Sequence, residues 1–128
     1  MRRIALAACL VVGLAACAVS GRPAQIFVVF FKEWSAELDG PAKGVIQTAA
    51  DWAKAHPNAP VTVAGYADPE GSLQANIDIS KTRAQRVFDE LAADGVPAGR
   101  IARTALGPVD YTLSSQESRR VEIRIGRD

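Results

Sequence analysis

The chain of 128 residues contains few of the residues that commonly build metal sites or cross-links: it has one histidine and two cysteines. These are too few for a multi-ligand zinc site or a disulfide-dense scaffold. The formal net charge is only +1, so the chain also lacks the basic excess typical of proteins that bind nucleic acid. Its length and its 48% of hydrophobic residues are typical of one globular domain of ordinary size.

The amino-terminal segment predicts a secretory signal. Two arginines precede an apolar run over residues 4–16, which is shorter than the roughly 20 residues that a membrane-spanning helix needs. Residues 14–17, with the sequence Leu-Ala-Ala-Cys, resemble the lipobox of bacterial lipoproteins, whose signal is cleaved before the cysteine. The resemblance implies a lipoprotein signal peptide over residues 1–16 and lipid attachment at Cys17. The alternative is an ordinary cleaved signal followed by a coincidental cysteine.

Lipidation at Cys17 would attach the mature chain to a membrane, because several acyl chains, such as palmitate, anchor a protein far more firmly than one. Cys9 would leave with the signal, so no thiol would remain for a disulfide. Ala18 stands where lipoproteins retained in the inner membrane often have aspartate, which suggests the outer membrane. We expect a lipidated cysteine and short tether over residues 17–25, and a folded domain over residues 26–128 on the periplasmic face.

The pattern of apolar residues predicts a domain with the element order β-α-β-α-β-β. Apolar or alternating runs predict four strands, over residues 26–31, 61–66, 101–106 and 120–125. Helical spacing predicts one helix between Asp39 and His56, and a second over residues 73–93 that stops at Gly95. The continuous apolar run of the first strand is typical of a strand buried on both faces. Two helices covering one apolar sheet face make a two-layer α/β sandwich of the α+β type, whose strand order the pattern leaves open.

The residues that hydrolases need are scarce. His56 stands at the expected end of a helix, where a cationic side chain is favoured, so the sequence indicates no Ser-His-Asp arrangement. Asp68 and Glu70 lie in one predicted turn, whereas a glycosidase needs two carboxylates that face each other across a cleft. We therefore expect a protein that is not an enzyme and that uses no cofactor or metal.

Three polar residues of the second predicted helix share one face. Asn76, Ser80 and Arg83 are spaced at i, i+4 and i+7. Because helical side chains lean toward the amino end of their helix, Arg83 can point back toward Asp68. A carboxylate and a guanidinium across a small space match a ligand that carries an ammonium and a carboxylate together. The spacing alone favours a simpler interpretation, an internal Asp68–Arg83 ion pair with Asn76 holding the loop.

A set of residues with fixed spacing begins at the end of the second predicted strand. Its members are Gly65, Asp68, Gly71, Ser72, Asn76, Ser80, Arg83, Ala84 and Val87. The set resembles the signature of OmpA-like peptidoglycan-binding domains, G-x-x-D-x-x-G-(S/T)-x-x-x-N-x-x-L-S-x-x-R-A-x-x-V, with Ile79 in place of the leucine. Similarity around residues 30–38, 95–101 and 118–123 extends the resemblance over nearly all of residues 26–126. The resemblance implies two helices packed on one mixed sheet.

The resemblance also implies a function. Domains of this family bind the peptide stem of peptidoglycan without cleaving it, usually through diaminopimelate. By the resemblance, Asp68 takes the ligand ammonium, Arg83 takes its carboxylate, and Asn76 shapes the site or donates to the ligand. Ser80 does likewise or packs the helix. We expect an outer-membrane lipoprotein that links the envelope to the cell wall, with peptidoglycan and not nucleic acid as its partner.

Departures from the family pattern leave a second interpretation open. Lys32 and Glu33 replace the short polar residues that often follow the first strand, and the common N-x-T-x-x-G-R-x-x-N segment is missing before Arg119. The predicted tether is short for a protein that must reach a separate wall layer. The alternative is a structural or assembly lipoprotein that keeps the fold but binds another envelope protein. Arg119 and Arg120 are expected to form ion pairs that support the fold.

Overall fold

The computed structural model describes residues 23–108 and 118–126. The predicted signal peptide, Cys17 and most of the predicted tether lie outside these residues, and so does most of the altered segment that precedes Arg119. The alternative of a protein partner, which depends on that segment and on the tether, therefore stays a prediction. No described helix combines the length and the apolar character that crossing a membrane requires.

The described residues form two α-helices, a short 3-10 helix and four strands. In chain order they are β1 (Gln25–Phe30), α1 (Gly40–Ala55), β2 (Val61–Ala67), α2 (Leu73–Ala93), η1 (Ala98–Arg100), β3 (Ile101–Pro108) and β4 (Arg120–Ile125). The predicted order β-α-β-α-β-β is confirmed, with η1 as an addition. The 3-10 helix was not predicted because three residues are too few to show a periodic pattern.

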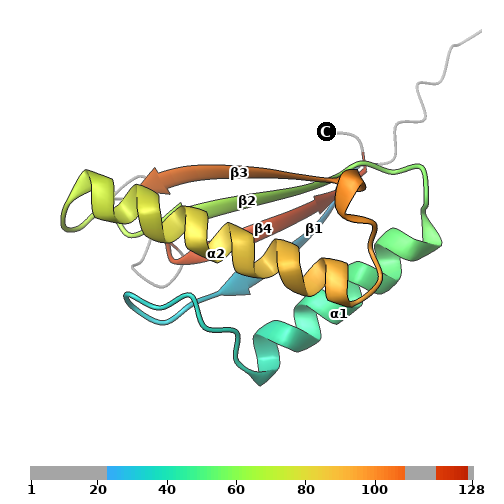
Figure 1. Cartoon of the computed structure of the whole chain (residues 1–128), viewed down its shortest axis with the longest axis horizontal. Helices are drawn as coiled ribbons and strands as arrows, with labels where there is room; N and C mark the ends of the chain where they lie inside the picture. Colours follow the sequence, from blue (N-terminus) through green and yellow to red (C-terminus); the bar gives the residue numbers. More distant parts are fainter. Residues whose placement is uncertain (1–22, 109–117, 127–128) are drawn as a thin grey trace, which may run out of the picture.

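The four strands form one mixed sheet with the order β1-β4-β2-β3. β4 runs antiparallel to both β1 and β2, whereas β2 and β3 are parallel and are connected through α2. β1, β2 and β3 therefore point the same way, and their carboxyl ends lie at the edge of the sheet where β4 begins (Figure 1). Both helices cover the same face, which confirms the predicted two-layer sandwich (Figure 1).

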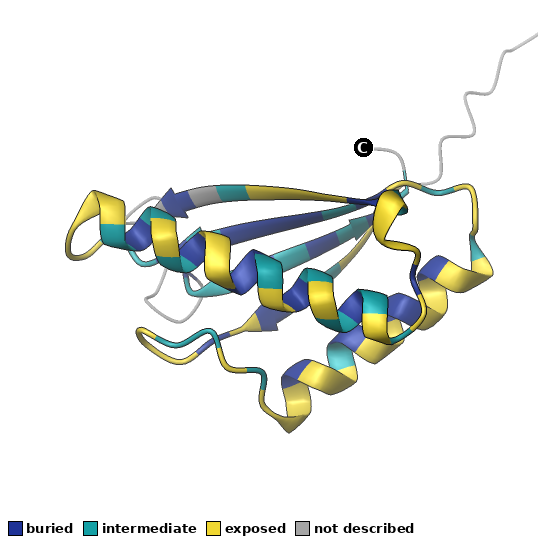
Figure 2. Cartoon of the chain, in the orientation of Figure 1, coloured by how far each residue is buried: buried dark blue, intermediate teal, exposed yellow. Residues whose placement is uncertain are grey.

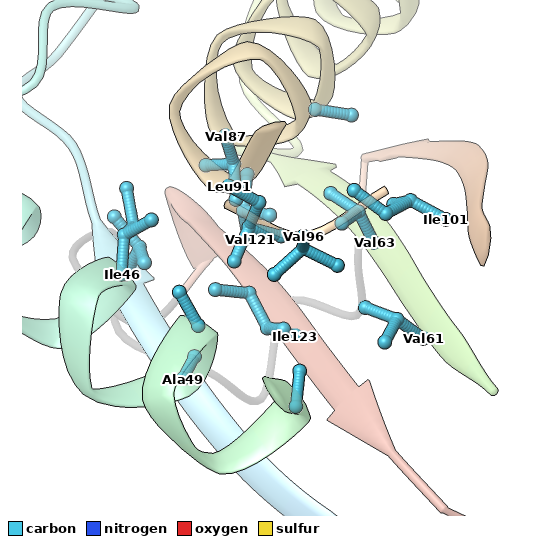
Figure 3. Packing of buried hydrophobic residues seen from close by; sticks show 14 of the residues in the cluster. Ile46, Ala49, Val61, Val63, Val87, Leu91, Val96, Ile101, Val121 and Ile123 are labelled. Atoms are coloured by element: carbon cyan, nitrogen blue, oxygen red, sulfur yellow. The ribbon is translucent and has the colours of Figure 1, made fainter. Parts of the chain in front are cut away.

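The hydrophobic core lies between the two helices and the covered face of the sheet. The buried sides of α1 and α2 face the strands, and their outer sides are exposed (Figure 2). In β4, Val121 and Ile123 are fully buried and point into this layer (Figure 3). The residues of the strand that alternate with them are on its other face and are only partly buried. α2 adds Val87 and Leu91 to this layer, and α1 adds Ile46 with a row of alanines (Figure 3).

Side-chain caps fix the start of both helices, and a glycine fixes the end of α2. The Asp39 carboxylate accepts a hydrogen bond from the backbone N–H of Ala42 at 2.9 Å, which caps α1. Ser72 caps α2 in the same way. Gly95 adopts a φ of 102° and donates its N–H to the carbonyl of Ala92, which stops α2. The boundaries predicted at Asp39 and Gly95 are thus confirmed.

The expectation that the first strand is buried on both faces is wrong. β1 lies at the edge of the sheet, and on its open face Ile26 and Phe30 remain 47% and 45% exposed. Val29, on the covered face, is buried. The apolar run is continuous because the outer face of this edge strand also carries apolar side chains. β1 also begins at Gln25, which the sequence had placed at the end of the tether.

Candidate functional site

A pocket lies where β1 and β2 end and β4 begins. It is lined by Glu33, Trp34, Asp68, Glu70, Asn76, Ile79, Arg83 and Arg119. These residues come from three segments: the loop after β1, the β2–α2 loop with the first half of α2, and the residue before β4. The structure therefore brings together Asp68, Asn76 and Arg83, three of the four binding residues predicted from the sequence.

The fourth predicted residue, Ser80, supports the pocket from the interior. Ser80 is fully buried and is not among the lining residues. Its hydroxyl donates to the carbonyl of Ile77 at 2.8 Å and accepts from the N–H of Gly107 at 3.2 Å, which connects α2 to β3. A Cβ on Gly65 would lie only 2.2 Å from the Ser80 carbonyl oxygen, so Gly65 allows α2 to lie directly against β2. Of the two roles left open for Ser80, its contacts support helix packing.

Arg83 is a buried cation that holds the loop after β1 in place. Only 1% of it is exposed, and its guanidinium donates to the carbonyl oxygens of Lys32 at 3.1 Å, Ser35 at 2.8 Å and Tyr66 at 3.4 Å. The side chain points toward the amino end of α2, as predicted. Because a guanidinium has five N–H groups, these three bonds to described residues leave it further donors for a ligand in the pocket.

The electrostatic surroundings of Arg83 favour an anion beside it. Burial lowers the pKa of Arg83 to about 10, with the nearby positive charge of Arg119 acting in the same direction and Asp68 opposing them. The guanidinium is therefore charged at neutral pH, although its protein acceptors are neutral carbonyl groups. The guanidinium also lies over the ring of Phe31, with its central carbon 5.3 Å from the ring centroid.

Asp68 is the acidic counterpart of Arg83 in the pocket, but the two do not form the predicted internal ion pair. Within the described residues, the Asp68 carboxylate pairs instead with Arg119, at 3.5 Å, and both side chains are less than one-fifth exposed. Arg119 is held at the end of β1 because its Nε donates to the carbonyl of Phe31. The simpler interpretation of the spacing is thus wrong in its choice of partner, and the carboxylate of Asp68 faces the pocket.

Asn76 holds the loop that carries Asp68. Its side-chain amide donates to the carbonyl oxygens of Glu70 at 2.7 Å and Ser72 at 3.0 Å, and 1% of the residue is exposed. These bonds use both hydrogens of the amide group. The predicted loop-holding role of Asn76 is confirmed, and of its two proposed parts in binding, the contacts support shaping the site over donating to a ligand.

The described pocket offers opposite charges to a ligand. The buried guanidinium of Arg83 can bind a carboxylate, and the carboxylate of Asp68 can bind an ammonium. Glu33 and Glu70 add negative charge to the pocket lining. Among the described residues, no group of three or more histidine, cysteine or acidic side chains lies close enough to hold a metal ion.

The model of the OmpA family matches residues 30–124, a range that includes all the residues lining the pocket. The chain belongs to the OmpA family. The predicted family and fold are therefore confirmed. The ion pairs predicted for Arg119 and Arg120 are also present, with Asp68 and Glu122, respectively.

Similar proteins include two whose names refer to peptidoglycan. The peptidoglycan-associated lipoprotein of Agrobacterium fabrum is 33% identical over 102 residues, which cover 74% of this chain and 58% of that protein. The peptidoglycan-binding protein ArfA of Mycobacterium tuberculosis is 41% identical over 85 residues, which cover 62% of this chain and 26% of that protein. The OmpA-family chain thus spans little more than half of the first relative and about a quarter of the second.

Solved structures support the fold. The crystal structure of the peptidoglycan-associated lipoprotein from Burkholderia pseudomallei has a TM-score of 0.70 and 23% identity, and the match covers 77% of this chain and 89% of that one. The periplasmic domain of Helicobacter pylori MotB has a TM-score of 0.69 and 17% identity, over 83% of this chain and 78% of that one. Both agree with the OmpA-like arrangement of helices and sheet.

Arg119 and Trp34 are among the pocket-lining residues of this OmpA-family chain whose place at the site was not predicted. Arg119 was expected to support the fold, yet it also lines the pocket beside Asp68. Trp34, which is 56% exposed, was not singled out. Neither residue belongs to the fixed spacing around α2, and both reach the pocket from distant segments. The only local signal for Trp34 was a large aromatic residue in a loop directly after a strand.

Proposed function

We propose that this OmpA-family protein binds the peptide stem of peptidoglycan through diaminopimelate, without cleaving it. The observation that carries the proposal is that Asp68, on the β2–α2 loop, and Arg83, on α2, line one pocket. The free end of diaminopimelate carries an amine and a carboxylate on one carbon, so it offers one partner to each side chain. The names of the peptidoglycan-associated and peptidoglycan-binding relatives support the same ligand class.

Each pocket residue has a distinct part in this proposal. Asp68 accepts from the ligand ammonium, and Arg83 donates to the ligand carboxylate. Because Asp68 is paired with Arg119, the ammonium shares the carboxylate with Arg119 or displaces it. Asn76 and Ser80 act by positioning, through their bonds to the loop and to β3, and do not themselves contact the ligand.

The proposed activity is binding and not catalysis. His56, the one histidine of the chain, caps α1, with its Nδ1 2.8 Å from the carbonyl oxygen of Trp52. It is not among the residues that line the pocket. Incubation of the purified protein with sacculi should therefore release no muropeptides, and a steady release would contradict the proposal.

Co-sedimentation with purified sacculi tests the assignment of the site. We expect Asp68→Asn to weaken binding by more than about tenfold, because it removes one partner of a charged hydrogen bond in a partly buried site. Asp78→Asn is the matched control, since Asp78 is exposed on α2 and its carboxylate bonds only to Gln74 among the described residues. Free diaminopimelate should compete with sacculi for the wild type. Normal sedimentation of Asp68→Asn would show that the site is wrongly assigned.

Arg83 needs a stability control because it also holds the loop after β1. Its loss leaves the carbonyl groups of Lys32 and Ser35 without their donor. We therefore propose Arg83→Lys, which keeps the charge but loses the forked geometry, as the test variant. Its sedimentation should fall well below that of the wild type at a temperature where circular dichroism shows both proteins to be folded.

We also propose that the chain is a lipoprotein of the outer membrane, attached through Cys17 and facing the periplasm. The lipobox-like residues 14–17 and the lipoprotein names of relatives support this. Labelling of cells with a clickable palmitate analogue should mark the wild type and a Cys9→Ala variant but not Cys17→Ala. Label in the Cys17→Ala protein would contradict attachment at this residue, and recovery of the labelled wild type with inner membranes would contradict the location.

A further inference from the structure

Trp34 lies in the loop between β1 and α1 with an unusual backbone conformation. Its φ is 51°, and it is the one non-glycine residue in the described part of the chain with a positive φ. The N–H of Ser35 donates to the carbonyl of Lys32 at 3.2 Å, which closes a tight turn around Trp34. Side chains larger than glycine are disfavoured in this region of φ, and turns with this conformation usually place glycine or asparagine there.

The indole ring of Trp34 lies against the loop on the other side of the pocket. Its outer carbons, Cη2 and Cζ2, are 3.3 and 3.4 Å from the position that a Cβ on Gly71 would occupy. Gly71 itself has a φ of 91°, so this loop leaves space that the ring fills. The ring also lines the pocket together with Asp68 and Arg83, yet 56% of Trp34 is exposed.

The hydrogen bonds that hold the loop do not involve the side chain of Trp34. Arg83 holds the loop through the carbonyl oxygens of Lys32 and Ser35, which are backbone atoms that any residue 34 would leave in place. A half-exposed ring gains less from burial than a core ring does, and its backbone conformation is strained. A strained and exposed aromatic residue at the entrance to a charged pocket points to a contact with the ligand.

We propose that Trp34 binds the aliphatic part of the stem peptide that leaves the pocket next to the diaminopimelate end, and that it thereby favours the peptide over free diaminopimelate. This inference rests on the proposed function. Asp68 and Arg83 hold the charged end of the ligand, so the residue of the stem peptide that adjoins diaminopimelate, with its own methylene groups, lies at the entrance. An aromatic face binds such apolar groups without needing a charge, and a tryptophan loses little conformational freedom in doing so.

Two variants separate a ligand contact from a structural role. Trp34→Gly removes the ring and also suits the positive φ, so we expect it to leave the melting temperature unchanged or higher. Trp52→Phe is the matched control: Trp52 lies on α1, 40% exposed and stacked on His56, and it is not among the pocket residues. Because the chain has two tryptophans, the Trp52→Phe protein reports the fluorescence of Trp34 alone.

The experiment is calorimetric titration of the full-length protein in detergent with a diaminopimelate-containing stem tripeptide and with free diaminopimelate. We expect Trp34→Gly to weaken tripeptide binding by about five- to tenfold, the size typical of an aromatic contact, and to change the affinity for free diaminopimelate less than about twofold. In the Trp52→Phe protein, the tripeptide should bind with wild-type affinity and change the emission of Trp34.

The outcomes distinguish this inference from the proposed function. If the wild type binds neither ligand, both the proposed function and the proposed role of Trp34 are wrong. If the wild type binds the tripeptide and Trp34→Gly binds it equally well, only the role of Trp34 is wrong. Equal loss of affinity for both ligands would also overturn the inference, because it would show that the ring shapes the pocket and does not contact the peptide outside it.

Discussion

At the scale of single residues, Gly65 controls how closely α2 approaches the sheet. A Cβ on this residue would lie 2.2 Å from the carbonyl oxygen of Ser80 and 3.2 Å from the side chain of Ala84. Because the nearest atom belongs to the helix backbone, it cannot rotate away, and α2 would have to shift. We expect Gly65→Ala to lower the free energy of unfolding by about 1–3 kcal/mol, as overpacking of a core does, measured by urea denaturation.

Gly44→Ala is the control for this prediction. Gly44 is exposed on α1, and a Cβ there would meet nothing within 4 Å. Alanine favours a helix more than glycine does, so Gly44→Ala should raise the free energy of unfolding by about 0.5–1 kcal/mol. If the two substitutions had equal effects, close contact between β2 and α2 would not be what requires glycine at position 65.

At the scale of elements, the carboxyl end of α1 is closed by a residue from η1. Arg100 donates to the carbonyl oxygens of Ala53 at 2.6 Å and Ala59 at 2.8 Å, and also to that of His56. The last carbonyl groups of a helix have no partner within the helix. We therefore expect Arg100→Ala to lower the free energy of unfolding by about 1–3 kcal/mol, measured by thermal denaturation.

Arg86→Ala is the control for the predicted effect of Arg100→Ala on stability. Arg86 is exposed on α2, so Arg86→Ala should alter the free energy of unfolding by less than about 0.5 kcal/mol. Arg100→Lys should recover only part of the loss, because one ammonium lacks the planar fork that reaches several carbonyl groups. An Arg100→Ala protein as stable as the Arg86→Ala protein would show that the bonds at the end of α1 add no net stability.

The same end of α1 shows where sequence patterns stop being informative. The cap at Asp39, the stop at Gly95 and the alternation in β4 were predicted because each depends on neighbours in the chain. The Arg100 contacts join residues more than 40 positions apart, and no local pattern contains them. The position of β1 at the sheet edge was missed for the same reason, since strand order is decided by long-range pairing.

The residues of the pocket also differ in whether local sequence patterns could predict them. Asp68, Asn76 and Arg83 were predicted because one loop and one helix face carry them at fixed spacing. Arg119 and Trp34 come from other segments, so their presence beside Asp68 depends on the register of β4 with β1 and on the loop that Arg83 holds. The spacing predicted Arg83 as the partner of Asp68 because the position of Arg119, about 50 residues further along the chain, cannot be predicted from local spacing.

At the scale of the whole molecule, the pocket joins three segments that meet only when the domain is folded. A ligand bound there should stabilise the folded state alone, since an unfolded chain cannot bring Asp68, Arg83 and Arg119 together. At a free concentration one hundred times Kd, the stem tripeptide should raise the free energy of unfolding by about 2.7 kcal/mol, measured by differential scanning calorimetry.

Stabilisation by the tripeptide should depend on the carboxylate of Asp68 in the pocket and not on carboxylates elsewhere on the surface. Asp78→Asn should show the full rise with tripeptide, because its exposed side chain lies outside the pocket. Asp68→Asn should show at most about half of this rise at the same concentration, because an affinity weakened by more than about tenfold leaves the ligand at less than about ten times the Kd of the variant. An undiminished rise in the Asp68→Asn protein would place the tripeptide elsewhere on the molecule, since linkage requires only that the ligand prefer the folded state, whichever site it occupies.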